Sequence, residues 1–535
     1  MSSPIEGTFA HEKGMIGFQE NNCFRGLISL ACVLGMLGGI GAGIMPAHAQ
    51  NQTQSALQNT ALVDWPVQGL PGNIDDVTIL QLPADPLNAA NILLHKIENQ
   101  GYPLAEVRIG ADRLIVTFGE IVEVVVEGYT YGGVVRVEDE RFDPGVEKLI
   151  HGYVDHLVGT SPTTDQLSHA TALIDDIPGV TASILLERID DLGHYRAVVR
   201  GAQERGGGVL SVRNTPTRRF ESREAALHQE FYSTFVGGDI LRVDLSAVNT
   251  TTTSRGYGLQ VSHEFPVNAY GTFFESRISH YDTTGENQFE AEQSADSTSS
   301  TAAVVLGHAF SRHVEIADYI YGELDFRTED NAGLGTSDYG VARAAFSETL
   351  HNDHGTTLSW SVSASGGQEF SDPDKRFGVI KGGGGLIFWL PELYETAEVR
   401  IEGAGQIGSR DVPGFELFSF GGNSNMRGFV PFEYAGVHGA DLTIELAETF
   451  QPWAPSSPIL TPYVFADAAY VANPSALASE SRPESNEILS AGFGSKMTFF
   501  NGFSMDGWLA KPIHDGEDSD RSNNVVFYLQ AQFSW

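Results

Sequence analysis

Cysteine is almost absent from this sequence of 535 residues, and both copies, Cys23 and Cys32, lie near its N-terminus. The rest of the chain therefore has no disulfide framework, no cysteine metal site and no cysteine nucleophile. Basic residues are also scarce. The chain has 32 Lys and Arg residues and 69 Asp and Glu residues, which gives a formal charge of −37. A sequence-independent nucleic-acid binder needs a basic face, so we expect no nucleic-acid partner.

Long hydrophobic runs are missing beyond the N-terminus, which excludes a bundle of membrane helices. A membrane β-barrel is not excluded, because its strands alternate between apolar and polar residues and hydropathy averages them away. Patterns for catalysis are missing too: the 16 histidines include no H-E-x-x-H pair, and no G-x-S-x-G elbow occurs. We therefore expect no catalytic residues, no metal and no cofactor.

The N-terminal segment has the features of a secretory signal peptide. The apolar stretch of residues 27–44 follows Arg25 and precedes Ala47-His48-Ala49, an A-x-A cleavage pattern. We assign residues 1–49 to this peptide, with Met15 as an alternative start and a single membrane anchor as the alternative interpretation. A chain free of cysteine after cleavage suits passage through an oxidising compartment.

Residues 50–201 indicate small α/β domains. We expect a flexible polar lead-in over 50–75 and an abridged α/β unit over 76–120, with a helix from Pro86 to Asn99. A second unit, 121–201, has the order β-α-α-β-β. Its expected elements are a strand over Ile121–Glu127, a helix over Pro144–Val158, a second helix from a capped start at Ser161–Asp165 to Ile177, and strands over Thr181–Ile189 and Tyr195–Arg200.

From residue 206 to Trp535 the pattern changes to strict alternation. In the last segment the apolar face holds Val525, Phe527, Leu529, Ala531, Phe533 and Trp535, whereas the other face is rich in glutamine and serine. Such alternation fits lipid outside and a wet lumen inside. Sixteen candidate strands begin near residues 208, 223, 239, 254, 271, 297, 313, 338, 355, 376, 393, 435, 459, 486, 503 and 523.

The connections alternate between long polar loops and tight turns such as Asn501-Gly502, a strong hairpin signal. Long loops on one rim and short turns on the other are typical of an outer-membrane barrel. An even strand number puts both ends of the barrel at the short-turn rim, so the α/β units should lie on the periplasmic side. Alternation alone would also allow a soluble β-sandwich or propeller.

A sequence motif near residue 420 resembles a known family. Residues 418–429, FSFGGNSNMRGF, resemble the F-x-x-G-G-x-x-x-V-R-G-F/Y motif of the outer-membrane superfamily that includes BamA and the two-partner secretion transporters of TpsB type. Phe465-Ala466-Asp467 resembles the F-x-D-x-G motif of a following strand, the α/β units resemble POTRA domains, and Phe533-Ser534-Trp535 resembles the aromatic C-terminus read by the barrel-assembly machinery. Two departures are Met426 in place of valine and Ala469 in place of glycine.

The resemblance implies an all-β membrane barrel of about 16 antiparallel strands preceded by small periplasmic POTRA-like domains. It implies an outer-membrane pore, working as a monomer in lipid, that exports an adhesin or haemolysin-like partner without ATP. The POTRA-like units would bind the N-terminal secretion domain of that partner. Two such units favour this transporter over a BamA-type insertase, and they argue against a passive porin. The short first unit places a family-type plug helix in doubt.

The resemblance also assigns roles to residues. Arg427 is expected to reach into the lumen and pair with Asp467 beside Phe465, while Gly421, Gly422 and Gly428 let the loop turn and Phe429 completes the motif. Without the motif, an exposed Arg427 would be the better reading. The POTRA-like sheets are expected to accept partner segments by β-augmentation, with Leu114–Phe118 and Thr181–Ile189 as candidate edges.

Two further stretches give weak signals. Gly382–Gly385 lacks the setting of a phosphate loop and is better interpreted as small residues inside a crowded lumen or at a barrel bend. The acidic stretch Asp515–Asp520 departs from the EF-hand spacing and is better interpreted as a solvated loop than as a calcium site.

Overall fold

The computed structural model describes most of the chain from residue 62 onward. The described residues are 62–71, 73–128, 130–132, 135–137, 142–216, 221–250, 255–284, 296–331, 335–352, 355–391, 396–422, 426–429, 434–450, 457–474, 484–499, 502–514 and 525–535. The expected signal peptide, both cysteines, Asn501 and the acidic stretch Asp515–Asp520 lie outside them.

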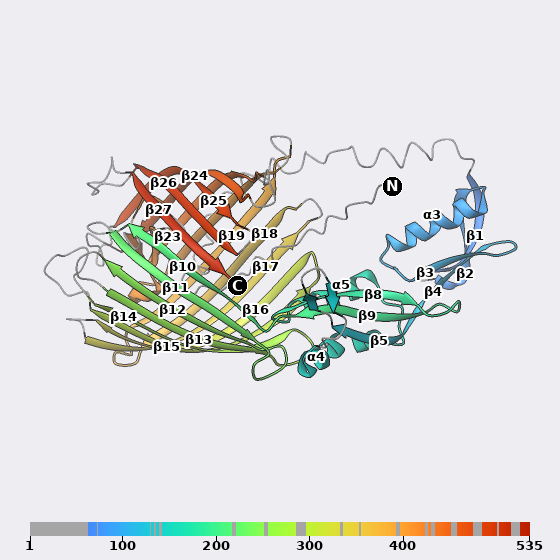
Figure 1. Cartoon of the computed structure of the whole chain (residues 1–535), viewed down its shortest axis with the longest axis horizontal. Coiled ribbons are helices and arrows are strands. Elements are labelled where there is room, and N and C mark those ends of the chain that lie inside the picture. Colours follow the sequence, from blue (N-terminus) through green and yellow to red (C-terminus); the bar gives the residue numbers. More distant parts are fainter. Residues whose placement is uncertain are drawn as a thin grey trace.

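Sixteen antiparallel strands, each paired with its neighbours in chain order, close into a barrel (Figure 1). This confirms the predicted fold class. The strands are β10 (Gly206–Pro216), β11 (Glu221–Tyr232), β12 (Ile240–Thr250), β13 (Arg255–Pro266), β14 (Thr272–Thr284), β15 (Ser297–Arg312), β16 (Ile316–Asn331), β17 (Gly335–His351), β18 (Thr357–Glu369), β19 (Arg376–Trp389), β20 (Ala397–Gly408), β23 (His438–Glu448), β24 (Ile459–Ala472), β25 (Ser485–Thr498), β26 (Phe503–His514) and β27 (Val526–Ser534).

The period-2 pattern separates an apolar outer wall from a polar lumen. On β27 and its start, the alternate residues Val525, Phe527, Leu529, Phe533 and Trp535 are exposed, as predicted. Exposed aromatic side chains gather near both rims, in the arrangement of the girdles that flank a lipid-facing band. Near the short turns they are Phe235, Tyr270, Phe310, Trp389 and Trp535, and near the long loops they are Tyr257, Phe326, Phe370 and Tyr470.

The barrel closes where β10 pairs with β27 over a short register, from Val209 opposite Ser534 to Arg213 opposite Gln530. Beyond this register a side chain continues the pairing. The Asn214 amide donates to the Phe527 carbonyl at 2.9 Å and accepts from the Leu529 N–H at 2.6 Å. Unpaired backbone groups are costly in hydrocarbon. The Asn214 amide therefore continues the contact between β10 and β27 where their backbones no longer pair.

Residues 409–437, between β20 and β23, form the sixth of the long loops, here called L6. L6 contains the 3₁₀ turn η2 (Gly414–Glu416) and a two-stranded ribbon of β21 (Phe418–Phe420) and β22 (Tyr434–Gly436). None of the described helices is long and apolar enough to cross a bilayer.

The second α/β unit has the predicted order, with a small ribbon added. Its sheet, in the order β5-β9-β8, is covered by two helices. The strands are β5 (Glu120–Gly128), β8 (Val180–Arg188) and β9 (His194–Gln203), the helices are α4 (Pro144–Val154) and α5 (Thr164–Asp175), η1 (Asp155–Leu157) extends α4, and the ribbon is β6 (Thr130–Gly132) with β7 (Val135–Val137). Thr163 and Gln166 form a capping box that starts α5.

The first α/β unit is larger than the sequence predicts. Its sheet has the order β2-β1-β4-β3 and packs against α3 (Pro86–Glu98). The strands are β1 (Leu62–Leu70), β2 (Asn73–Pro83), β3 (Ala105–Ile109) and β4 (Leu114–Phe118). The prediction of a flexible lead-in up to residue 75 is therefore wrong from residue 62 on. Strands β1 and β2 pair antiparallel, and Val67 and Leu82 lie in the apolar core of this unit.

Helices α4 and α5 of the second unit rest on the short turns of the barrel, as Figure 1 shows. Asp176, directly after α5, accepts two hydrogen bonds from Arg312 at 2.7 and 2.8 Å and one from the Tyr319 hydroxyl at 2.9 Å. The Ser168 hydroxyl accepts from the Val314 N–H at 3.0 Å. The α/β region thus lies at the short-turn rim, as the even strand number predicts.

The Asp176→Asn substitution should loosen this contact, because hydrogen bonds to a charged group contribute about 1.5–3 kcal/mol. We would replace Cys23 and Cys32 by serine, introduce Ser168→Cys and Val314→Cys, and measure the rate of cross-linking by a short thiol-reactive linker. The rate should fall in Asp176→Asn and stay unchanged in Asp165→Asn, an exposed carboxylate on the same helix. Equal rates in both variants would contradict a role for Asp176 in docking.

Candidate functional site

The described residues of L6 lie inside the barrel, where an apolar cluster packs them against the wall. Phe418, Phe420, Met426 and Phe429 are each at most 1% exposed. They pack with inward-facing side chains of the wall, which are Ala404 on β20, Ala469 and Val471 on β24, and Ile488 on β25. Each fully buried side chain of this size contributes about 1.5–3 kcal/mol, so the described part of L6 is a packed element.

Three motif glycines allow L6 to turn back on itself. Gly421, Gly422 and Gly428 have φ angles of 112°, 96° and 98°, in the left-handed region that a side chain disfavours. The Gly422 N–H donates to the Phe429 carbonyl at 2.9 Å, which closes the turn around the arginine. The glycines thereby set the direction in which Arg427 leaves the loop.

Arg427 and Asp467 form a bidentate ion pair in the lumen. The Nε and Nη2 atoms of Arg427 lie 3.0 and 2.9 Å from the two carboxylate oxygens of Asp467. The backbone N–H of Arg427 also donates to Asp467 at 2.9 Å. Asp467 is 0% exposed and Arg427 is 8% exposed. One buried carboxylate on β24 therefore fixes both the side chain and the backbone of the loop.

Two more groups of the wall complete the arginine site. The Nη1 atom of Arg427 donates to Glu445 on β23 at 2.7 Å, and its guanidinium carbon lies 3.4 Å from the ring centroid of Phe465. Burial alone would lower the pKa of Arg427, but the hydrogen bonds and attraction of Asp467 and Glu445 outweigh it and raise that pKa. Arg427 therefore remains a cation inside the lumen.

Both departures from the motif lie in the apolar cluster around this site. Met426 is 0% exposed and Ala469 is 7% exposed, and both belong to the cluster that packs L6 against the wall. Methionine replaces valine as another apolar side chain, and its flexibility lets it fill an irregular gap. The departures thus leave the charge pairing of Arg427 intact.

The structure brings the predicted loop-motif and barrel-wall residues together. Gly421, Gly422, Arg427, Gly428, Phe429, Phe465 and Asp467 meet in the lumen. Phe533 and Trp535 instead stack on each other on the exposed outer wall, with ring centroids 6.0 Å apart. Both rings therefore face outward from the barrel wall.

Sequence reasoning missed Glu445, the second carboxylate partner of Arg427. Its position opposite Phe465 in the register between β23 and β24 is what brings it to the arginine. The only sequence signal is an acidic residue on the inward face of a strand, which many strands of this barrel share. The pairing register was needed to single it out.

Other candidate sites do not extend this picture. Gly382–Gly385 lies within the extended strand β19, which excludes a phosphate loop there. Among the described residues no group of three His, Cys, Asp or Glu side chains is placed to hold a metal ion.

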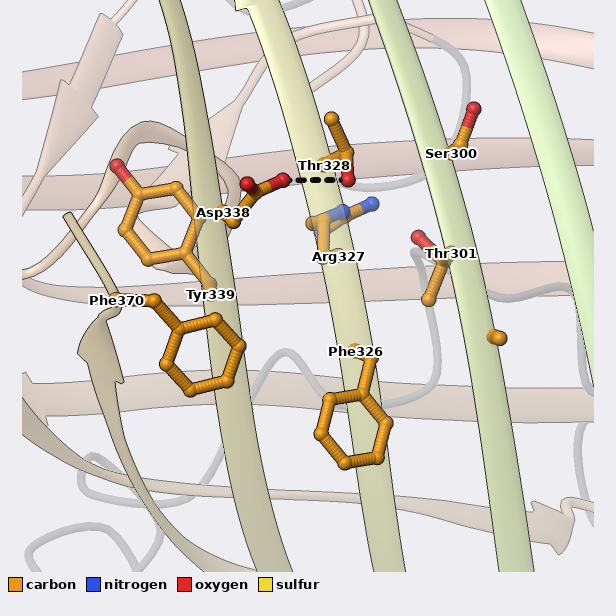
Figure 2. A pocket seen from close by; sticks show the side chains of 9 residues that line it. Ser300, Thr301, Phe326, Arg327, Thr328, Asp338, Tyr339 and Phe370 are labelled. Carbon is orange, nitrogen blue, oxygen red and sulfur yellow. Dashed lines mark hydrogen bonds between the residues drawn. The ribbon is translucent and has the colours of Figure 1, made fainter.

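A shallow hollow near the long-loop rim, shown in Figure 2, faces outward from the barrel wall. Thr328 donates to Asp338 there at 2.7 Å, and the exposed rings of Phe326 and Phe370 lie 6.4 Å apart. Because these rings face the lipid side, this hollow lies off the route through the lumen.

Comparisons with known proteins agree with this geometry. The sequence model of the haemolysin secretion/activation protein family ShlB/FhaC/HecB matches residues 232–497, from the end of β11 through β25. These residues include L6, Arg427 and its partners. A search among curated protein sequences finds no match.

Three solved structures resemble the fold over most of the chain. CdiB from Acinetobacter baumannii has a TM-score of 0.66 at 13% identity and covers 95% of this chain and 97% of its own. CdiB from Escherichia coli has a TM-score of 0.68 at 13% identity, covering 91% and 96%. BamA from Haemophilus ducreyi lacking POTRA domains 1–3 has a TM-score of 0.50 at 14% identity, covering 83% and 93%. At these identities the likeness shows the fold.

Removing the arginine should free the tip of L6 while the strands of the barrel remain closed. Arg427→Ala leaves the Asp467 carboxylate buried without its partner, which costs about 3–5 kcal/mol. We expect faster chymotrypsin cleavage at the phenylalanines of L6, with the electrophoretic mobility of the folded barrel unchanged.

Two control variants separate this effect from general damage. Arg410→Ala changes an exposed arginine in the same loop and should leave cleavage at the wild-type rate. Arg427→Ala combined with Asp467→Ala also removes the fully buried carboxylate, although Glu445 remains. The increase in its cleavage rate should be smaller than the sum of the increases in the two single variants. Wild-type protection of L6 in Arg427→Ala would show that the ion pair does not hold the loop.

Proposed function

We propose separate roles for the parts of this chain, which belongs to the ShlB/FhaC/HecB haemolysin secretion/activation family and is an outer-membrane two-partner secretion transporter. The chain is a transporter whose barrel spans the outer membrane and whose N-terminal α/β region is periplasmic. Its partner is a secreted protein. We propose that this cargo is large, of the adhesin or haemolysin type, and that it passes through the barrel without ATP.

The periplasmic units receive the cargo in this proposal. Strand β8 supports this role, because in the described part of the chain it pairs with β9 alone. The opposite edge strand, β5, is partly covered, since Ile121 exchanges backbone hydrogen bonds with Gly159 and Thr160. An extended N-terminal segment of the cargo can therefore add to β8 by β-augmentation. Strand β4 (Leu114–Phe118), the other predicted edge, is wrong as a candidate, since it lies between β1 and β3.

L6 controls passage through the lumen in this proposal. The bidentate contact of Arg427 with Asp467 and its contact with Glu445 hold the loop in place between export events. Export then depends on a loop that is fixed at rest and can be released. The buried pair supports this role because its geometry fixes a single position of the loop tip.

The remaining parts serve assembly. We propose that Phe533 and Trp535 form the signal read by the barrel-assembly machinery, that the barrel works as a monomer in outer-membrane lipid, and that the chain is not an enzyme. The closed wall and its exposed aromatic side chains support a lipid-embedded monomer.

An insertase of BamA type is the second candidate function. It is supported by the fold likeness to BamA, although that likeness is weaker than the likeness to the two CdiB structures. The two functions differ in what disappears when the protein is lost. A transporter supplies one secreted partner, whereas an insertase supplies many outer-membrane barrels.

Deletion of the gene should remove one large protein from the culture medium and leave the outer-membrane barrels unchanged. Quantitative mass spectrometry of both fractions measures this and identifies the cargo. Complementation with Arg427→Ala should restore the barrel to the membrane but less than about a tenth of the export, because the loop tip is no longer held in its resting geometry. Complementation with Arg410→Ala should restore both.

Each alternative outcome has a clear meaning. A broad loss of outer-membrane barrels in the deletion strain would replace the transporter by the insertase. Full export by Arg427→Ala at normal protein levels would remove the role proposed for the arginine.

A charge on the β8 edge should weaken cargo capture. Leu185 faces outward on β8 and is 39% exposed, and a lysine there opposes pairing with another strand. We expect Leu185→Lys to weaken binding of the purified N-terminal segment of the cargo by at least about tenfold. Val122→Lys, at a 41% exposed position on β5, is the matched control and should bind normally. Loss of binding in Val122→Lys alone would move the docking edge to β5.

A further inference from the structure

The base of L6 is anchored separately from its tip, through Glu416 in η2. This glutamate is 2% exposed. Its Oε1 accepts from the Arg343 guanidinium on β17 at 2.6 Å, and its Oε2 pairs with the Lys381 ammonium on β19. One buried carboxylate of the loop thus meets two cations from two strands of the wall.

Aromatic and apolar contacts support this second anchor. The Phe415 ring lies 4.4 Å below the Arg327 guanidinium carbon and packs edge-to-face on Tyr339, with ring centroids 5.1 Å apart. Val412 and Leu417 are 6% exposed and join an apolar cluster with Val341, Phe377, Val379 and Val437. The base of L6 therefore fits into the wall formed by β17 and β19.

The backbone around Glu416 is bound to the wall as well. Gln406 on β20 is 2% exposed, and its amide donates to the Glu416 carbonyl at 2.8 Å and to the Val437 carbonyl at 3.3 Å. One side chain thereby ties the start of L6 to its end. The position of Glu416 is set by its backbone as well as by its charge.

Arg343 connects Glu416 to a longer row of charges along the lumen. Its Nη1 donates to Glu323 on β16 at 2.7 Å, and Glu323 lies 3.3 Å from Arg277 on β14. Burial alone would raise the pKa of Glu416, but Lys381 and Arg343 outweigh it and hold that pKa below its usual range. Glu416 is therefore an anion that balances cations of the wall.

We propose that Glu416 is a second positioning residue of L6, which fixes the base of the loop to β17 and β19 independently of the Arg427 contact with β23 and β24. Release of L6 then requires both contacts to break. This inference rests on the proposed function of L6 in controlling passage. Glu416 then fixes the resting position of the base of L6, and Arg427 fixes that of its tip.

The full-length protein in planar lipid bilayers provides the main test. Glu416→Gln keeps the shape of the side chain and removes its charge, so the base of L6 should detach more often. We expect the probability of open, high-conductance events to rise at least about tenfold, with export reduced. Glu416→Asp should keep most of the wild-type behaviour. Glu315→Gln, at an exposed position on a short turn, should behave as wild type.

A charge exchange keeps the test valid if Glu416→Gln fails to assemble. Glu416→Lys combined with Lys381→Glu retains one anion and two cations in the site. This double variant should therefore assemble and show few open events. Each single variant changes the charge balance and should fail to assemble or should open often. Failure of this exchange to restore assembly or closure would overturn the assignment.

The variants also separate this inference from the proposed function. An open probability of the Glu416→Gln and Arg427→Ala double variant above that of either single variant supports independent contacts. Open probability equal to that of Arg427→Ala alone would refute independence. Wild-type conductance in Glu416→Gln, with a clear effect of Arg427→Ala, would overturn the role of Glu416 and leave the proposed function standing. Wild-type conductance and export in both variants would remove the control by L6 itself.

Discussion

Arg427 carries a full positive charge into the barrel, and the geometry of the loop depends on how that charge is balanced. Asp467 binds the Arg427 guanidinium through two oxygens and also accepts a hydrogen bond from the backbone N–H of Arg427. Because the fork of arginine fits a carboxylate in one orientation, the contact fixes direction as well as position. The loop must then arrive and leave at set angles, which explains why glycines with positive φ flank the arginine at positions 421, 422 and 428.

The wall of the barrel is shaped to receive this loop. Where L6 passes close to the strands, glycines in the wall leave room for its side chains. A Cβ on Gly439 would lie 2.1 Å from the Phe418 ring, and one on Gly408 would lie 2.8 Å from Val412. The backbone of the wall is satisfied by its own neighbours, which membrane burial requires. Small residues can therefore replace large ones inside the lumen at no cost to the hydrogen-bond ladder.

Sequence periodicity predicted the parts of the fold that depend on neighbours in the chain. Alternation located sixteen strands, because the outer face must be apolar at every second residue wherever it meets lipid. It failed for β1 (Leu62–Leu70), because Pro66 is a poor strand residue that argues against a strand on sequence alone, and pairing with β2 decides the structure. The motif led to Arg427 and Asp467. Glu445 and Glu416 stayed hidden, because their partners are set by strand register and by contacts between residues far apart in sequence.

Apolar packing and ion pairs divide the work of holding L6. Burial of four large apolar side chains contributes attraction without direction, so by itself it would tolerate small shifts of the loop. A buried ion pair does not tolerate such shifts, because separation of the two partners leaves a buried charge without a counter-charge. Both Arg427 and Glu416 are loop residues whose partners sit on strands. Withdrawing the loop therefore breaks contacts between loop and wall only, and the ladder that closes the barrel remains intact. The docking of the second α/β unit on the turns is separate from this ladder too, since side chains such as Asp176 and Arg312 mediate it. The barrel can thus stay closed to lipid while its loop and its periplasmic unit each change position.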